Sequence, residues 1–257
     1  MFRLFLTELK REWILQLRYS AEIISFVIGL TIVFYGLFQS TRYIAGPGVQ
    51  LGDRLDSIIV GYVLWSFSLF ILGEIAGGLQ REAQTGTLEQ LFLSPFSAAQ
   101  IFITRGIANL TIQFALNGTI LLLIMVMTGS RLSFPPTLLL PLGTVLLGAY
   151  GLALAMGSLA LVLKRVQQVL GIFQFLLFFL LLIPAESWAG SANFLVWLLP
   201  MTPGTELLRA LMARGQPLDW VQFLIALLNG VAYLVLGLFL FGVAERQAKR
   251  RGLLGGY

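Results

Sequence analysis

The stretch 171-GIFQFLLFFLLLIP-184 decides the fold class of this chain. It is continuously apolar apart from Gln174, whereas a strand of a lipid-exposed barrel alternates apolar and polar residues. The stretch belongs to an apolar segment at about 166–183, which is close to the length that a bilayer core demands of a helix. We therefore expect a membrane-spanning helix here.

Five further segments have the same apolar character and similar lengths. The whole chain is 58% hydrophobic and 11% charged, with a mean hydropathy of +0.87, far from the averages of soluble domains. We expect residues 1–257 to form a single all-α transmembrane domain with six spans and no separate soluble domain. The other five predicted spans are at about 21–38, 57–76, 107–128, 138–162 and 221–243.

Lysine and arginine gather on one side of these spans. Of the 17 basic residues, 12 fall on one side and five, Arg42, Arg54, Arg131, Arg209 and Arg214, on the other. Because the richer side is normally cytoplasmic, we expect both termini in the cytoplasm of a bacterium, with inner loops at 81–106 and 164–165. This bias also accounts for the net charge of +5, so no nucleic-acid partner is expected for the basic tail.

The segments at the two membrane surfaces differ in pattern. Residues 1–20 place apolar side chains on one helical face and basic ones elsewhere, which predicts an interfacial helix that anchors the chain or also contacts a cytoplasmic partner. Residues 184–220 contain Trp188 and Trp197, an apolar patch too short to span and an amphipathic run. We expect a re-entrant helical hairpin at the outer surface, either a cap over the bundle or a gate.

Composition excludes several kinds of chemistry. The chain has no cysteine and no histidine, which rules out disulfides, thiolate or imidazole metal sites and histidine-dependent triads. No phosphate-binding glycine motif occurs. Glu22, Glu74 and Arg105 fall near predicted cytoplasmic helix ends, where a structural role is typical. No catalytic, cofactor-binding or metal-binding residue is therefore expected.

Polar and aromatic residues inside the spans suggest packing or a pathway. Asn109, Gln113 and Asn117 recur every fourth residue and share one helix face; they either bond neighbouring helices or line a polar path. Phe173, Gln174 and Phe178 either fill the core or line an apolar substrate path. Small residues predict close helix contacts, either within the chain or between subunits, namely at Gly73, Gly77, Gly151, Ala153, Ala155 and Gly157.

The inner loop carries a segment of another kind, 81-REAQTGTLEQLFLSP-95. Thr85 or Thr87 can begin a short helix that Pro95 ends. Its apolar residues favour docking in a groove of another protein. Lipid headgroups are a weaker alternative, because the segment is not basic.

At this point the residues resemble a known family. The run 81-REAQTGTLEQLFLSPFSAAQIFITRGIAN-109 closely resembles the segment after the second span of ABC-2 type exporter permeases, and 198-LLPMTPGTELLRALM-212 is similar to the element before their last helix. The six-span plan and the leading amphipathic helix are also similar to the ABCG-like, or type V, exporter transmembrane fold. The resemblance covers essentially the whole chain.

The resemblance implies a permease subunit that is not itself an ATPase. ATP and Mg would be bound by separate nucleotide-binding (ATPase) subunits, and a second permease copy or a paralogue would complete the pathway in the lipid bilayer. Residues 81–95 would be the coupling helix on the ATPase. The implied coupling residues are Arg81, Glu82, Gly86, Thr87, Leu88, Glu89, Leu91, Ser94 and Pro95, and the implied outer gate residues are Pro200, Pro203, Glu206 and Arg209.

The cargo is the least constrained inference. Apolar, phenylalanine-rich spans favour export of a hydrophobic or amphipathic substrate, a drug or a lipid. A polysaccharide or glycolipid exporter of the same family remains open. The rival function classes are a membrane scaffold or sensor that transports nothing, and a membrane-embedded enzyme.

Overall fold

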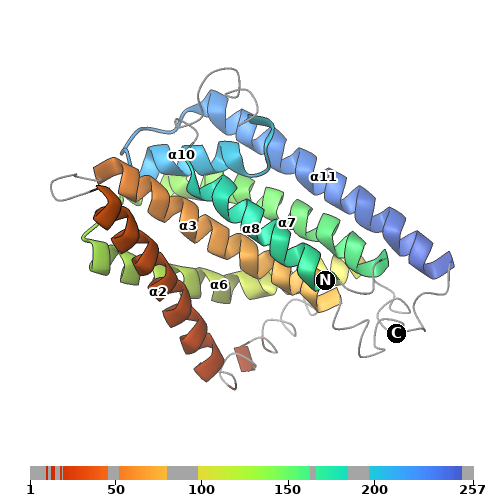
Figure 1. The fold of residues 1–257 in the computed structure, drawn as a ribbon. Helices are drawn as coiled ribbons and strands as arrows, with labels where there is room; N and C mark the ends of the chain where they lie inside the picture. The colour runs from red at the N-terminus through yellow and green to blue at the C-terminus, as the bar shows by residue number, and fades with distance from the viewer. Residues whose placement is uncertain are drawn as a thin grey trace.

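The structure, a computed structural model, describes residues 20–45, 52–79, 98–162, 166–184 and 197–250, together with Lys10, Trp13, Ile14 and Arg18. These residues form helices and connecting turns, and no strand occurs among them. The predicted all-α fold class is therefore confirmed for the described part (Figure 1). Its helices are α2 (Ser20–Ala45), α3 (Gly52–Leu72), α6 (Ala98–Thr128), α7 (Leu139–Val162), α8 (Gln167–Leu182), α10 (Thr202–Met212) and α11 (Trp220–Arg250), with a π-helical turn η1 (Gly73–Gly77) and a 3-10 turn η2 (Pro136–Leu138).

All six predicted spans coincide with helices, but their lengths differ. Five of the helices, α2, α3 with η1, α6, α7 and α11, are long and apolar enough to cross a membrane. The sixth, α8, has 16 residues and is about 24 Å long, shorter than a hydrocarbon core of about 30 Å. The structure thus supports five full spans and a shorter apolar helix.

Successive long helices run in alternate directions through the bundle (Figure 1). The first turns of α3, the last turns of α6 and α8, and all of α10 gather at one end, called the α10 end below. There the Ser130 hydroxyl donates to Asp56, and the Ser133 N–H donates to the Met212 carbonyl over 2.8 Å. The turn η1, the start of α6 and the end of α11 lie at the opposite end.

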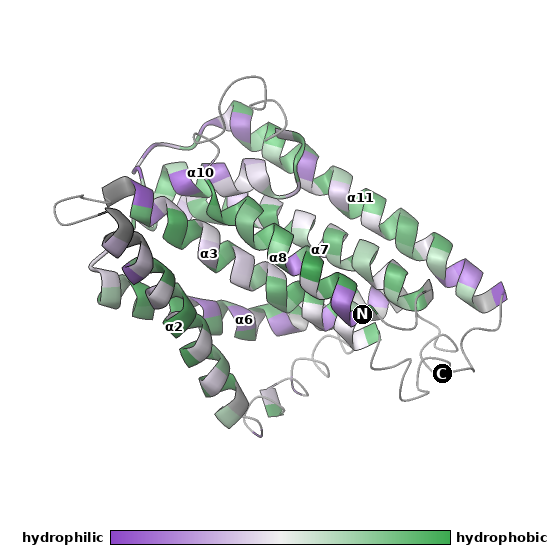
Figure 2. Cartoon of the chain, viewed as in Figure 1, coloured by the Kyte–Doolittle hydropathy of each residue, from purple (hydrophilic) through white to green (hydrophobic). Residues whose placement is uncertain are grey.

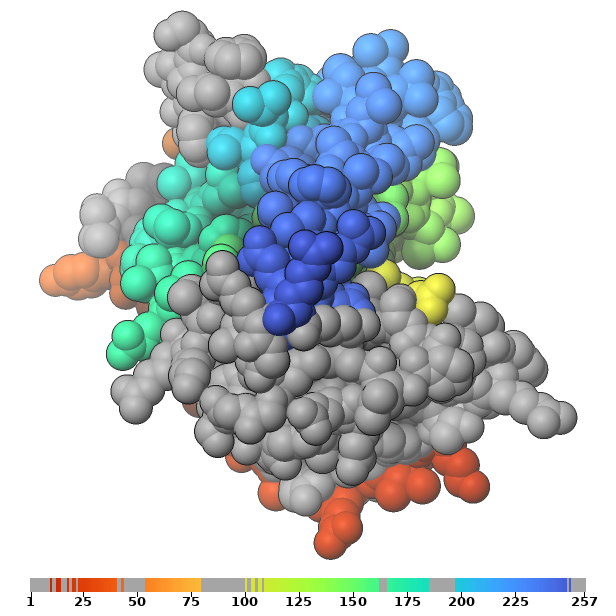
Figure 3. Space-filling model, turned by 90° about the vertical axis from the view of Figure 1, so that its right-hand side faces the viewer, coloured from red at the N-terminus to blue at the C-terminus, as the bar shows by residue number. Residues whose placement is uncertain are grey.

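Helix α3 occupies the centre of the bundle. Of its apolar span 67% is buried, against 22% for α2, 28% for α6 and 17% for α11. The ribbons of the outer helices are mostly apolar (Figure 2), and their exposed side chains include Ile32 of α2, Phe175 of α8 and Leu228 of α11. Helix α11 lies along the outside of the molecule (Figure 3). Such surfaces fit a lipid environment rather than water.

Glycines bring α7 and α11 into backbone contact. A Cβ at Gly151 would collide with the Tyr233 backbone, and one at Gly230 would lie 2.5 Å from the Thr144 carbonyl oxygen. The prediction of close packing is confirmed for Gly151 and for Gly157, whose added Cβ would lie 2.9 Å from Leu79 Cδ1. For Gly73 and Gly77 no described atom of this chain lies within 4 Å of an added Cβ, so a close contact there, which would have to be with a second subunit, stays a prediction.

Two predicted surface segments fall mostly outside the described residues. Of the interfacial segment 1–20, the described positions Lys10, Trp13, Ile14, Arg18 and Ser20 are helical. The coupling segment 81–95 lies wholly outside, and so does 185–196 of the predicted hairpin. The interfacial helix and the coupling helix stay predictions.

Helix α10 is more deeply embedded than an outer interfacial helix would be. Nine of its 11 residues are buried, including Thr202, Pro203 and Thr205 of its first turn and the charged Arg209. It packs on α3, α7 and α11. Helix α10 therefore forms part of the bundle itself rather than a cap lying on it, and the re-entrant hairpin to which it would belong stays a prediction, because 185–196 lies outside the described residues.

Candidate functional site

Helix α10 begins at an unusual backbone turn. Met201, its N-cap, has a φ of 64°, which is rare for a residue other than glycine. Pro203 lies in the first turn, where its missing N–H leaves no hydrogen bond unmade. The Thr205 hydroxyl donates to the Met201 carbonyl over 3.0 Å. The sequence M-T-P-G-T therefore fixes the place where α10 starts.

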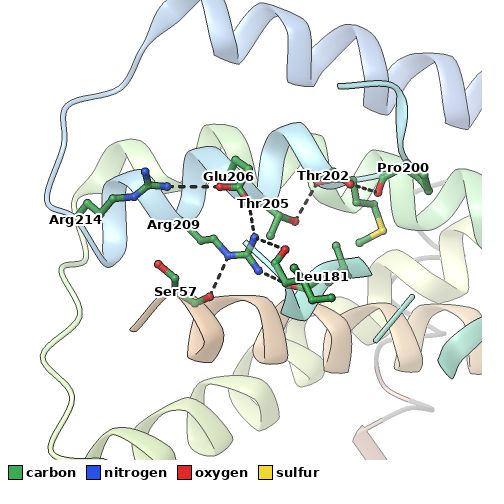
Figure 4. A network of polar contacts seen from close by, with 10 residues as sticks. Ser57, Leu181, Pro200, Thr202, Thr205, Glu206, Arg209 and Arg214 are labelled. Atoms are coloured by element: carbon green, nitrogen blue, oxygen red, sulfur yellow. Dashed lines mark hydrogen bonds and ion pairs between the residues drawn. The ribbon is translucent and has the colours of Figure 1, made fainter. Parts of the chain in front are cut away.

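Arg209 points from α10 into the bundle and joins three helices (Figure 4). Its Nε donates to the Ser57 carbonyl of α3 over 3.0 Å. Its Nη2 donates to the Leu181 carbonyl at the end of α8, and its Nη1 donates to the Ile183 carbonyl over 3.4 Å. The side chain is fully buried. One guanidinium thus satisfies backbone acceptors of both α3 and α8.

The charge of Arg209 is balanced within its own helix. Glu206, one turn earlier, accepts from Arg209 Nη1 through Oε1 and lies 3.5 Å from Arg214 Nη2 through Oε2. The carbonyls at the end of α8 add the negative end of a helix dipole. A buried guanidinium needs such partners, because an uncompensated charge in the protein interior is strongly destabilising.

Gly61 makes room for this network. A Cβ at that position would collide with the Leu181 carbonyl oxygen and lie 2.6 Å from Arg209 Nη2. Any larger residue therefore pushes α3 and α8 apart or displaces the guanidinium.

The turn before α10 is held by α11. Asn229 donates from Nδ2 to the carbonyls of Trp197 and Leu199 over 3.0 and 3.1 Å, and it accepts from the Met201 N–H over 3.3 Å. The Tyr233 hydroxyl donates to the Leu198 carbonyl over 2.9 Å. Of the predicted gate residues, Pro203, Glu206 and Arg209 belong to α10, and Pro200 lies in this turn and accepts from the Thr202 hydroxyl over 3.3 Å.

The amides of α6 share one buried face, as their spacing predicts. Asn117 accepts from the Ser66 hydroxyl of α3 and donates to the Gln113 carbonyl over 3.0 Å. Asn117 therefore joins two helices. The side-chain oxygens of Asn109 and Gln113 have no hydrogen-bond partner in the described part of the chain.

The α8 residues assigned to the same path lie elsewhere. Phe178 packs edge-on against Trp65 and Tyr62 of α3, at ring distances of 4.8 and 6.3 Å. The backbone carbonyl of Gln174 accepts from the Trp65 indole over 3.0 Å, and Phe173 packs on the core. Asn117, by contrast, lines an apolar cavity of about 140 Å³ between α3, α6, α7 and α10. That cavity is lined by none of the three α8 residues.

Charged groups outside the network are few in the described residues. They include no group of three or more His, Cys, Asp or Glu side chains able to hold a metal ion. The nine predicted coupling residues, from Arg81 to Pro95, lie outside the described part of the chain, so their role stays a prediction. The arrangement that the structure does present is a polar latch, defined as Arg209 with Glu206 and the carbonyls of Ser57, Leu181 and Ile183.

The family comparison agrees with the fold. Residues 3–213 match the family model described as ABC-2 type transporter. The chain belongs to the ABC-2 type transporter family. It is a multi-pass membrane permease subunit of this family, whose members associate with ABC ATPase subunits. No curated protein matches the chain. The matched range includes both segment 81–95 and helix α10, so the latch belongs to the ABC-2 domain.

Sequence reasoning missed three residues that organise this site, namely Gly61, Ser66 and Asn229. Gly61 and Ser66 carry no signal of their own among the apolar residues of α3. Asn229 was a detectable signal, since it is an amide well inside the last span, whereas the span's other amide, Gln222, lies at its beginning. Arg209 was assigned to the gate but also counted with the outer surface charges, and its full burial was not anticipated.

Proposed function

We propose that the chain is the transmembrane subunit of an ATP-driven exporter that moves a hydrophobic or amphipathic substrate, a drug or a lipid, outward by alternating access. The observation that carries the proposal is the family match over residues 3–213, which includes the inner segment 81–95. ATP and Mg are bound by separate ATPase subunits, and 81–95 is the coupling helix that docks on them. Both termini face the bacterial cytoplasm.

The latch suggests how movement at one end of the bundle is controlled. Separation of α3 from α8 at the α10 end requires Arg209 to release the carbonyls of Ser57 or Leu181. A latch of this kind favours two discrete arrangements over a gradual opening. The α10 end is therefore proposed as the outer gate, which the ATPase opens through α3 and α8.

Charge distribution supports this orientation. Arg54, Arg131 and Arg214 lie at the α10 end, whereas Arg246 and Arg250 lie at the end of α11 on the opposite side. The second group joins the basic residues of the inner loops, which fits the positive-inside rule.

Cavity size supports a pathway shared between two permease copies. The apolar cavity of about 140 Å³ is smaller than the roughly 300–1,000 Å³ of sites for drug-sized ligands. The exposed face of α8 carries Ile172, Phe175, Leu176 and Phe179. We propose that this aromatic face lies at the seam with a second copy or paralogue and forms the cargo path there.

The test is reconstitution in liposomes with a candidate ABC ATPase subunit from the same organism. The two proteins should copurify, and one class in a panel of lipids, hydrophobic drugs and glycolipids should stimulate ATP hydrolysis and accumulate across the membrane. An ATPase without its catalytic glutamate is the control. Stimulation by glycolipids alone would replace the drug or lipid assignment, and failure to bind any ATPase would favour a scaffold or sensor.

A further inference from the structure

A small polar cavity lies between η1, α6 and α7, away from the latch. Four of its lining residues carry side-chain oxygens: Glu74 of η1, Asn109 and Gln113 of α6, and Tyr150 of α7. The remaining lining is apolar apart from Gly106. The centre of a water-sized particle can occupy about 10 Å³ of this cavity, so the cavity has room for about one water molecule or ion.

Three of these oxygens are buried without a protein partner. Asn109 Oδ1, Gln113 Oε1 and Tyr150 Oη make no hydrogen bond among the described residues, and their side chains are only 6%, 6% and 7% exposed. Buried polar groups nearly always have a partner. Three orphans around one cavity therefore point to a ligand held between them.

The backbone is shaped to bring these oxygens together. Glu74 lies in a π-helical turn, a feature that frequently marks functional sites because it changes the direction of the side chains within a helix. Gly106 leaves space for the ring of Tyr150, since a Cβ there would lie 2.8 Å from Cε1 and 2.9 Å from Oη. Both features bring an oxygen to the same cavity.

We propose that this cavity binds one monovalent cation, Na⁺ or K⁺, through the oxygens of Glu74, Asn109, Gln113 and Tyr150. Carboxylate, amide and hydroxyl oxygens are the ligands of hard cations. A single water molecule donates only two hydrogen bonds, so it serves the three acceptors, Glu74, Asn109 and Gln113, only where the Tyr150 hydroxyl donates to the third. A cation satisfies all of them. The one carboxylate in the cavity balances one positive charge, which favours a monovalent over a divalent ion.

The bound cation would pin three helices at the end of the bundle opposite the latch. The turn η1, which carries Glu74, continues directly from α3, and Arg209 bonds α3 near its other end. Cation binding thus stabilises the packing of α3 on α6 and α7. The inference concerns binding by this chain alone and does not depend on its cargo or ATPase.

The test uses the purified full chain in lipid nanodiscs. Thermal unfolding is followed by tryptophan fluorescence in NaCl, KCl or N-methyl-D-glucamine chloride at one ionic strength, and binding of radioactive ²²Na⁺ is measured by scintillation proximity. Na⁺ or K⁺ should raise the melting temperature in a saturating manner, as expected for a ligand of the native state. The bound stoichiometry should be one ion per chain, and competition of K⁺ against ²²Na⁺ identifies the preferred ion.

Variants separate this site from a general salt effect. Glu74→Gln and Gly106→Ala should abolish the cation-dependent shift, and Tyr150→Phe, which keeps the ring, should weaken binding by about tenfold. Gly118→Ala on the same helix is the matched control, since no described atom lies within 4 Å of its added Cβ, and it should keep the shift. Equal melting temperatures in all three salts together with no ²²Na⁺ binding, or an unchanged shift in Glu74→Gln, would overturn the proposal.

Discussion

Arg209 and Leu181 lie 28 positions apart in the sequence, and the Arg209 guanidinium donates to the Leu181 carbonyl at the buried end of α8. The same guanidinium reaches Ser57 of α3 over 3.0 Å. Because Arg209 belongs to α10, this single side chain makes the short helix a clamp on two apolar helices. The predictions below start from that geometry.

Removing the guanidinium should destabilise the permease. Arg209→Met leaves the carbonyls of Ser57 and Leu181 and the Glu206 carboxylate without their buried partner, and breaking such a buried pair typically costs about 3–5 kcal/mol. The expected result is a clearly lower melting temperature in nanodiscs, with a smaller loss for Arg209→Lys. Arg214→Met is the control, because Arg214 is 24% exposed and lies 3.5 Å from the same Glu206 carboxylate. Equal stability of Arg209→Met and the control would contradict the role of the latch.

Gly61 should tolerate no side chain. The added methyl group in Gly61→Ala meets the Leu181 carbonyl oxygen and Arg209 Nη2, so either α8 shifts or the guanidinium moves, at a cost of about 1–3 kcal/mol. Thermal unfolding is the measurement. Gly36→Ala of α2 serves as the matched control, since no described atom lies near its added Cβ. Stability as high as that of the control would show that α3 and α8 are farther apart than described.

Asn229 should hold the turn before α10, residues 197–201, in its observed conformation. Asn229→Leu removes the donors to Trp197 and Leu199 and the acceptor for the Met201 N–H. Each hydrogen bond of this kind contributes about 0.5–1.5 kcal/mol. Hydrogen exchange at 197–201 should therefore accelerate well beyond that in Tyr233→Phe, which loses only the bond to Leu198. Unchanged exchange would mean that the turn is held by other contacts.

The proposed coupling helix at 81–95 carries two glutamates, Glu82 and Glu89, whose charge can be reversed. Replacing both Glu82 and Glu89 by Lys should leave membrane insertion normal but uncouple ATP hydrolysis by the partner from export, because the docking groove then meets the wrong charge. Transport and ATPase rates in liposomes provide the measurement. Gln247→Lys, an exposed change on α11, is the control. Normal transport in the double variant would remove 81–95 as the coupling helix.

Hydropathy was enough to locate the long helices, because each must bury or expose to lipid about 20 apolar residues. It could not give their ends. Helix α11 continues to Arg250 through the basic tail, and α6 begins at Ala98, nine residues before the apolar run. Helices propagate through polar residues once nucleated, so the apolar run marks a minimum length.

The placement of α10 shows the limit of pattern alone. Its sequence T-E-L-L-R-A-L-M is amphipathic and typical of a surface helix. In the bundle, nine of its 11 residues are buried, and Arg209 bonds the carbonyls of Ser57 and Leu181, which are backbone acceptors without a sequence signal. The i, i+4 spacing of Asn109, Gln113 and Asn117 did predict their shared face, because all three residues lie on one helix, whose geometry is known in advance. The π-helical turn at Glu74 had no comparable signal.

The most direct test of the proposed mechanism is a distance across the latch. Since the chain contains no cysteine, Arg54→Cys and Ile183→Cys introduce two unique sites for spin labels at the α10 ends of α3 and α8. The distance is measured by pulsed electron resonance in the complex with its ATPase, without nucleotide and after trapping with ATP and vanadate. The account predicts one distance without nucleotide and a second, longer one after trapping. An identical distance distribution in both states would contradict a latch that opens during export.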